Sequence, residues 1–219
     1  MNTINTKFQV FNTGVYALGW FETVALRIAD KMSDSREMEM LAGQLACPSG
    51  EQGIEIGHKM STLNEFIAAS AIRVLAPETG ERILEIGPGN GALSRPIAEA
   101  VGDDGHYTGV EASPVMADQA VAFFKACGAE NVTIHPEEFD TFEFDRGRLD
   151  GVMAVNVIYF VEDIDALFSK ICAVLRPGGR VVIGVRSAES LRQMPFTEFG
   201  FVIRALEEIT GSMERSGLT

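Results

Sequence analysis

The sequence predicts an α/β domain in which helices cover both faces of a doubly wound, mostly parallel sheet. After Gly80, short apolar runs alternate with stretches of helical periodicity, the order that gives parallel strands joined by helices. The runs are almost unbroken, which is typical of strands buried on both faces. Before Gly80, the apolar residues recur only at helical spacing. The 219 residues therefore accommodate one α/β domain and a helical attachment.

The helical attachment is expected at the N-terminus. Apolar residues at helical spacing predict one helix over 15–32 and a second from about Met60 to Leu75. The stretch between them is looser, and the Cys-Pro-Ser-Gly run at 47–50 is a turn signal. We expect residues 1–76 to form a helical cap over the ligand-binding end of a domain formed by residues 77–219.

The alternating part of the chain predicts five strands and four helical segments, each defined by its hydrophobic period. The strands are expected at 82–86, 106–110, 132–135, 151–155 and 180–185, and the helices at 92–101, 114–127, 164–175 and, for the most part, 193–216.

Composition excludes several classes of function. The formal net charge is −13 and the basic residues do not cluster, so a nucleic-acid partner is not expected. No apolar stretch reaches the ~18 residues of a membrane span, and the first 11 residues do not resemble a secretory signal. Cys47, Cys127 and Cys172 are too far apart for a zinc site or a disulfide framework. They suit buried, reduced thiols. We therefore expect a cytoplasmic protein that binds a small molecule and no metal.

The strongest local signal is the run Gly87-Pro88-Gly89-Asn90-Gly91, between the first strand and a helix. Glycine lets the backbone turn sharply and lets a ligand approach without a Cβ in the way. The helix behind it offers N–H groups and partial positive charge. This spacing also satisfies the looser dinucleotide fingerprint, and a plain tight turn is the other alternative.

Two acidic residues near this loop discriminate between ligands. Glu85 lies two residues before Gly87 in an otherwise apolar strand, where it would repel a pyrophosphate and suit a cationic ligand; the alternative is a solvated strand-end charge. Glu111 closes the next strand, 24 residues after Gly87, the usual place for an acid that holds both hydroxyls of a ribose. For Glu111 the alternative is a surface residue in a turn.

From Arg82 to Arg186 the chain resembles the class I S-adenosylmethionine-dependent methyltransferases, whose fold is Rossmann-like. The resemblance is carried by LEIGPGNG at 84–91, VEAS at 110–113, DGVMAVNVIYF at 150–160 and LRPGGRVVI at 175–183. Residues 48–50 with Met60 and Asn64 are weakly similar to the N-terminal region of some bacterial members that act on small molecules. The resemblance implies S-adenosylmethionine as cofactor, S-adenosylhomocysteine as product and a small organic acceptor.

The resemblance also implies which residues bind the cofactor. Glu85 would face the ammonium group, and the loop backbone would surround the methionine carboxylate and the ribose edge. Pro136 occupies the family's usual Asp position, so Glu137 or Glu138 would substitute for it; an exposed acidic turn with Phe139 in the core is an equal alternative. The complete set is Glu85, Gly87, Pro88, Gly89, Asn90, Gly91, Glu111 at the ribose, Ala112 near the adenine, Glu138, Phe139 stacked on the ring, and Asn156 beside the sulfonium.

The acceptor side is less defined by sequence. Met60, Tyr159 and Phe160 are candidate pocket residues, with core packing as the alternative for the two aromatic rings. Methyl transfer can depend on positioning alone, so no catalytic residue is assigned. The histidines at 58, 106 and 135 fit structural or exposed positions better than a general base. A nicotinamide oxidoreductase and a non-catalytic cofactor-binding module are the alternative functions.

The sheet of the family continues past its fifth strand with a helix and two further strands. Here a helix is expected over 199–216 and a turn over 216–218, after which the sequence ends. The strand at 180–185 would then be an edge strand with the apolar composition of a buried one. We expect a C-terminally shortened protein that lacks strands six and seven. Its exposed edge would be covered by another copy or would promote aggregation.

Overall fold

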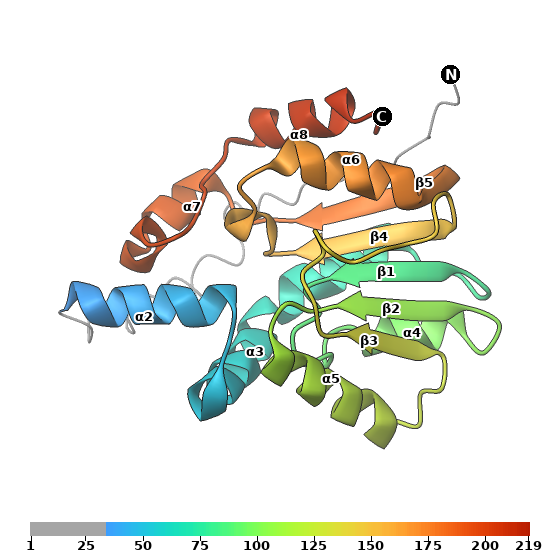
Figure 1. Cartoon of the computed structure of the whole chain (residues 1–219), viewed down its shortest axis with the longest axis horizontal. Coiled ribbons are helices and arrows are strands. Elements are labelled where there is room, and N and C mark those ends of the chain that lie inside the picture. The colour runs from blue at the N-terminus through green and yellow to red at the C-terminus, as the bar shows by residue number, and fades with distance from the viewer. Residues whose placement is uncertain (1–33) are drawn as a thin grey trace.

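The computed structural model describes residues 34–219 and contains one five-stranded sheet (Figure 1). The strands are all parallel, in the order β3-β2-β1-β4-β5. This order reverses direction between β1 and β4, and ligands of open α/β sheets bind at the carboxyl ends of the strands there. The bounds are β1 (Arg82–Ile86), β2 (His106–Val110), β3 (Val132–His135), β4 (Leu149–Val155) and β5 (Leu175–Gly184).

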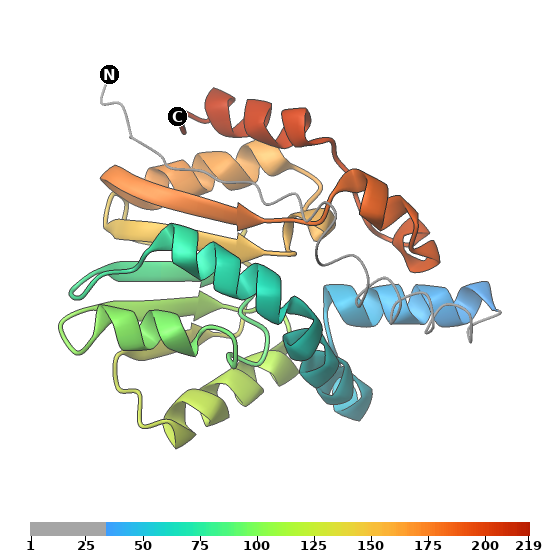
Figure 2. The ribbon, with the colours of Figure 1, turned by 180° about the vertical axis from the view of Figure 1, so that it is seen from behind.

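Helices cover both faces of the sheet, as the pair of opposite views shows (Figures 1 and 2). Successive strand residues point to opposite faces. Leu84 packs into the cluster that includes α6 (Ile164–Val174) and α8 (Leu206–Arg215). Its neighbour Ile83 packs into a second cluster, which includes α3 (Gly50–Leu75), α4 (Arg95–Val101) and α5 (Pro114–Ala126). The predicted doubly wound α/β class is confirmed.

The N-terminal segment is more helical than the sequence prediction allows. The helix predicted at 15–32 lies outside the described residues. The helix predicted from Met60 begins ten residues earlier, at Gly50. The stretch before it was predicted to be irregular, but part of it forms a helix, α2 (Ser35–Ala46). The Asp34 carboxylate starts α2 by accepting a hydrogen bond from the backbone N–H of Arg36 at 3.1 Å. Of the turn predicted at 47–50, residues 47–49 separate α2 from α3, and Gly50 is already the first residue of α3. No described helix has the length and hydropathy needed to cross a membrane.

The segment after β5 is less helical than predicted. In place of one helix over 193–216, the chain forms α7 (Ala188–Arg192), the short 3-10 helix η2 (Pro195–Glu198), an extended stretch and then α8. Gly200 interrupts the helical pattern with a positive φ of 75°. The buried Arg204 side chain then holds the extended stretch by donating to the carbonyls of Ile158 at 3.0 Å and Val161 at 2.7 Å.

Strand β5 lies at one edge of the sheet. It begins at Leu175, so the expected start at Arg180 is wrong, and its register shifts where it meets Leu149 and Gly151 of β4. Among the strands within residues 34–219 it pairs only with β4, and no sixth or seventh strand is present there. The side chains of residues 181–183 are nevertheless at most 1% exposed, because α3 and α6 cover the two faces.

The cysteines differ from expectation. Cys47 and Cys127 are exposed and Cys172 is half-buried, so the prediction of buried small hydrophobes is wrong for the first two. All three are free thiols. The described residues contain no group of side chains placed to hold a metal ion.

Gly105 lies where the chain enters β2, and this position provides a test of the packing. A Cβ there would lie 2.6 Å from the carbonyl oxygens of both Glu81 and Val101. Backbone atoms cannot swing aside, so we expect Gly105→Ala to lower the free energy of unfolding by about 1–3 kcal/mol. Gly43→Ala is the control: it has open space in an exposed helix and should stabilise by about 0.5–1 kcal/mol. Chemical denaturation measures both; wild-type stability of Gly105→Ala would contradict this packing.

Candidate active site

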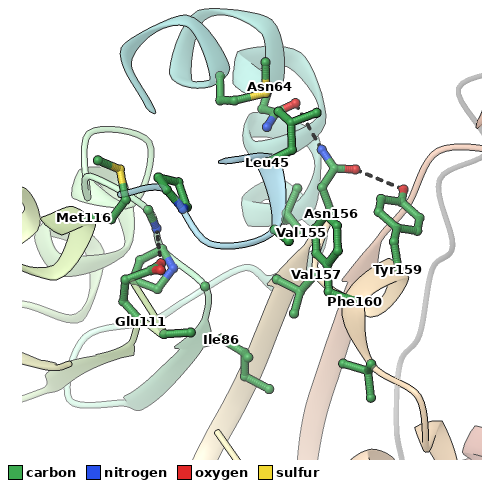
Figure 3. A pocket seen from close by; sticks show the side chains of 18 of the residues that line it. Leu45, Asn64, Ile86, Glu111, Met116, Val155, Asn156, Val157, Tyr159 and Phe160 are labelled. Carbon is green, nitrogen blue, oxygen red and sulfur yellow. Dashed lines mark hydrogen bonds between the residues drawn. The ribbon is translucent and has the colours of Figure 1, made fainter. Parts of the chain in front are cut away.

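A cavity of about 850 Å³ opens at the carboxyl ends of β1, β2 and β4. It lies in the upper part of the ~300–1,000 Å³ range of ligand pockets. Side chains of α2 and α3, including Leu45 and Asn64, line it together with the strand ends. Figure 3 shows Glu111 and Tyr159 on opposite sides of this cavity. The cavity therefore occupies the position at which an open α/β sheet binds its ligand.

All predicted cofactor residues except Gly91 line this cavity, and so do the predicted acceptor residues Met60, Tyr159 and Phe160. Gly91 packs against α5 and does not line the cavity: a Cβ there would lie 2.9 Å from the ring of Phe124 in α5. It has a positive φ of 77° and permits close packing of the loop on that helix.

Glu111 is a buried carboxylate at the end of β2, with 6% of its surface exposed. The surface-residue alternative is therefore wrong. Its two oxygens accept hydrogen bonds from the backbone N–H groups of Gly89 at 2.8 Å and Ser113 at 2.9 Å. Burial raises the pKa of this carboxyl, and the two N–H donors oppose that rise. A carboxylate has about four lone-pair sites, so Glu111 can still accept further hydrogen bonds.

Glu85 is also buried, with 5% of its surface exposed, so the solvated alternative is wrong here too. The Tyr107 hydroxyl donates a hydrogen bond to it at 2.7 Å. Burial raises the pKa of Glu85 to about 7, while the hydroxyls of Ser94 and Tyr107 oppose the rise and Glu111 adds to it. A positively charged ligand group in the cavity would stabilise the ionised form of this side chain.

The glycine loop does not present the N–H groups expected of an anion-binding turn. The N–H of Gly87 donates to Val110 at 2.9 Å, that of Gly89 to Glu111, and that of Gly91 to Pro88 at 3.2 Å. With these donors occupied and two acidic side chains nearby, the loop is poorly suited to a pyrophosphate. Gly89 still leaves open space at its Cβ position, so the loop can closely approach a ligand.

Asn156 follows β4 and adopts a left-handed φ of 57°, which is uncommon for a residue other than glycine. Its side chain is held at both ends: Nδ2 donates to Asn64 Oδ1 at 3.0 Å, and Oδ1 accepts from the Tyr159 hydroxyl at 3.1 Å (Figure 3). Burial raises the pKa of Tyr159 well above its ordinary value, so the hydroxyl stays a donor. These bonds fix the turn beside the cavity.

In the segment after β3, Phe139 lies both in the core and at the cavity. Phe139 is 6% exposed and belongs to a core cluster, and it also lines the cavity. Glu138 lines the cavity and is exposed, whereas Glu137 is not among the lining residues. The Lys170 ammonium lies 5.0 Å from the centre of the Phe139 ring, and this contact holds the ring in place.

Sequence reasoning named Asn64 only through a weak family similarity and missed the hydrogen bonds by which α3 is attached to the loops that line the cavity. The Ser61 hydroxyl donates to Asn90 Oδ1 at 2.9 Å, and Asn64 holds Asn156. The Ser113 hydroxyl bonds the carbonyl of Pro48, in the link between α2 and α3. Ser61 and Asn64 are polar residues one turn apart on an otherwise apolar helix face, which was the available signal.

All three histidines lie in the described part of the chain, and none lines the cavity. His58 is exposed on α3, and His106 lies 2.9 Å from the hydroxyl of Thr133. Burial lowers the pKa of His106. His135 packs beside Phe142, with 4.4 Å between ring centres. The geometry therefore assigns no histidine as a general base.

Comparison with known proteins shows which proteins this domain is similar to. Residues 83–179 match a family model described as a methyltransferase domain. The aklanonic acid methyltransferase DauC of Streptomyces sp. (strain C5) is 31% identical over 110 residues, which are 50% of this chain and 50% of that protein. For the first three curated relatives, the match spans half or less of their own length.

Solved structures agree with this result. Phosphoethanolamine N-methyltransferase 2 of Haemonchus contortus, in complex with S-adenosylmethionine, is 26% identical with a TM-score of 0.58, over 68% of this chain and 36% of that one. A SAM-dependent methyltransferase from Aquifex aeolicus shares the fold at 15% identity, with a TM-score of 0.60 over 74% of this chain and 87% of that one. Residues 83–179 therefore match the methyltransferase-domain family model, and the fold is similar to that of S-adenosylmethionine-dependent methyltransferases.

Proposed function

We propose that the protein transfers the methyl group of S-adenosylmethionine to a small organic acceptor. The observation that carries this proposal is the pair of buried carboxylates, Glu85 and Glu111, beside a loop whose three glycine N–H groups are occupied. This donor set favours a ligand with hydroxyl groups and positive charge over one with a pyrophosphate. When bound, the sulfonium supplies an electrophilic methyl group.

In this proposal, different lining residues hold different parts of the cofactor. Glu111 accepts hydrogen bonds from the ribose hydroxyls with its remaining lone pairs. Glu85 faces the ammonium group, Ala112 and Phe139 contact the adenine, and the backbone carbonyl of Asn156 receives the ammonium. The proposal is supported by the shared cavity that these residues line. Their contribution to the rate is positioning.

Residues 1–76 act as a cap in this proposal, and residues 77–219 as the cofactor-binding domain. Side chains of α2 and α3 line the cavity, and the bonds from Ser61 and Asn64 support coupling between the cap and the cofactor loops. Closure of such a cap excludes water from the acceptor and the sulfonium. The three free thiols are consistent with the proposed cytoplasmic location.

Ligand-dependent melting tests the proposed function. We expect S-adenosylhomocysteine to raise the melting temperature and NAD to leave it unchanged. A ligand that binds only the folded state stabilises it by about 2.7 kcal/mol at a hundredfold excess over Kd. A shift with NAD alone, or equal shifts with both ligands, would favour the nicotinamide alternative. Binding without turnover over a broad acceptor panel would favour a non-catalytic module.

A further inference from the structure

We infer that the acceptor is a molecule with a flat, apolar body and no anionic group, held against an aromatic wall on the β4–β5 side of the cavity. The aromatic wall consists of Tyr159, Phe160, Phe196 and Phe201, which all line the cavity. The inference rests on the proposed function, because it specifies the acceptor of that same site.

Phe201 is the centre of the aromatic wall. Its ring centre lies 4.7 Å from that of Phe160, 5.9 Å from that of Phe196 and 6.1 Å from that of Tyr159. The Tyr159 and Phe201 rings are stacked with 23° between their planes. Aromatic side chains bind flat apolar surfaces through offset-stacked and edge-to-face contacts. A planar ring system therefore complements this wall better than a small polar molecule does.

The aromatic wall is fixed before any ligand binds. The backbone N–H of Val202 donates to the carbonyl of Tyr159 at 2.7 Å. Arg204 is 8% exposed and donates to the carbonyls of Ile158 and Val161. These bonds join the segment after η2 to the loop after β4, which carries Tyr159 and Phe160. A preorganised surface loses little entropy on binding.

The aromatic wall and the proposed cofactor side lie on different parts of the sheet. Glu85 and Glu111 belong to β1 and to the end of β2, whereas Tyr159 follows β4 and Phe196 follows β5. Figure 3 shows Glu111 and Tyr159 across the cavity from each other, with Asn156 bonded to Tyr159. The cavity volume of about 850 Å³ leaves room for a second ligand beside the cofactor.

The charge of the lining argues against an anionic acceptor. Among the described residues that line the cavity, six side chains are acidic and two are basic, Lys170 and Arg186. Lys170 donates to the carbonyl of Asp140 at 2.8 Å, and Arg186 to Asn64 Oδ1 at 3.3 Å. The balance attracts a sulfonium and repels a carboxylate or phosphate.

A matched pair of probes tests the inference by calorimetry. The probes are 2-naphthol and 6-hydroxy-2-naphthoate, which share the ring system and differ in a carboxylate. With the protein saturated with S-adenosylhomocysteine, we expect 2-naphthol to bind at least tenfold more tightly. Phe201→Ala should weaken 2-naphthol binding about tenfold, which corresponds to about 1.4 kcal/mol. Phe66→Ala is the control, because Phe66 is 60% exposed on α3 and should change nothing. Neither variant should alter affinity for S-adenosylhomocysteine.

Three results would overturn the inference: tighter or equal binding of the naphthoate, unchanged 2-naphthol affinity in Phe201→Ala, or no 2-naphthol binding by protein that binds S-adenosylhomocysteine. If Phe201→Ala does not fold, Phe160→Leu replaces it with the same expected direction. Failure of S-adenosylhomocysteine itself to bind would refute the proposed function separately. The same naphthol comparison on the ligand-free protein would then still show whether the aromatic wall binds a flat apolar molecule.

Discussion

Replacement of Glu111 by alanine is expected to weaken binding of S-adenosylhomocysteine at least tenfold without unfolding the protein. In the proposed complex, Glu111 accepts hydrogen bonds from the ribose hydroxyls, and hydrogen bonds to a charged group contribute about 1.5–3 kcal/mol each. A loss of about 1.4 kcal/mol is already tenfold. The side chain also accepts from Gly89 and Ser113. The substitution therefore loosens the loop that forms the other edge of the site.

Calorimetry of the variant measures this effect, and thermal melting separates it from loss of the fold. Glu111→Gln is the matched control: it keeps the size of the side chain and one acceptor oxygen, so its loss of affinity should be smaller. Unchanged affinity in a folded Glu111→Ala protein would mean that the ribose lies elsewhere.

Glu85→Gln should make the protein more stable at alkaline pH relative to wild type. The pKa of Glu85 is about 7 in the folded state against an ordinary value of 4.5. Between these values the folded state holds a proton that the unfolded state has released, so the contribution of Glu85 to wild-type stability falls as pH rises from about 4.5 to about 7 and is level above. The integrated effect from pH 5 to pH 8 is about 2–3 kcal/mol. Glutamine keeps an acceptor for Tyr107 and lacks this titration.

The same titration couples Glu85 to the cofactor. A ligand ammonium near Glu85 favours its ionised form, so binding should release a proton. With a free-state pKa of about 7, wild-type affinity for S-adenosylhomocysteine should rise about tenfold from pH 6 to pH 8. Glu85→Gln should bind more weakly and with a smaller pH dependence. Denaturation at several pH values and calorimetry in two buffers of different ionisation enthalpy measure the two effects. An equal pH dependence in wild type and variant would exclude this role.

The parts of the site encoded by adjacent residues were accessible from sequence. The apolar strand, the glycine loop and Glu85 lie within one run of ten residues, 82–91, and the positive φ angles of Gly87 and Gly89 follow from their residue type. The register of β1 and β2 then brings Glu111 next to this loop. The hydrogen bond from Gly89 to Glu111, which changes what the loop can bind, depends on that tertiary placement.

Elements that depend on distant partners were harder to predict. Phe196, Phe199 and Ile203 recur at helical spacing, but Gly200 interrupts the pattern. Arg204 holds the extended stretch through carbonyls more than 40 residues away. For α2 the signal was present: Asp34 caps the helix, and Met38, Leu41 and Leu45 recur at helical spacing against the core. The aromatic wall combines two segments that no local pattern connects.

A crystal structure of the protein with S-adenosylhomocysteine tests the central claim most directly. We predict that the ligand occupies the cavity at the ends of β1, β2 and β4, with both ribose hydroxyls within hydrogen-bonding distance of Glu111. Its sulfur should face Tyr159 and Phe160. A ligand bound outside this cavity, or one whose ribose does not contact Glu111, would contradict the account.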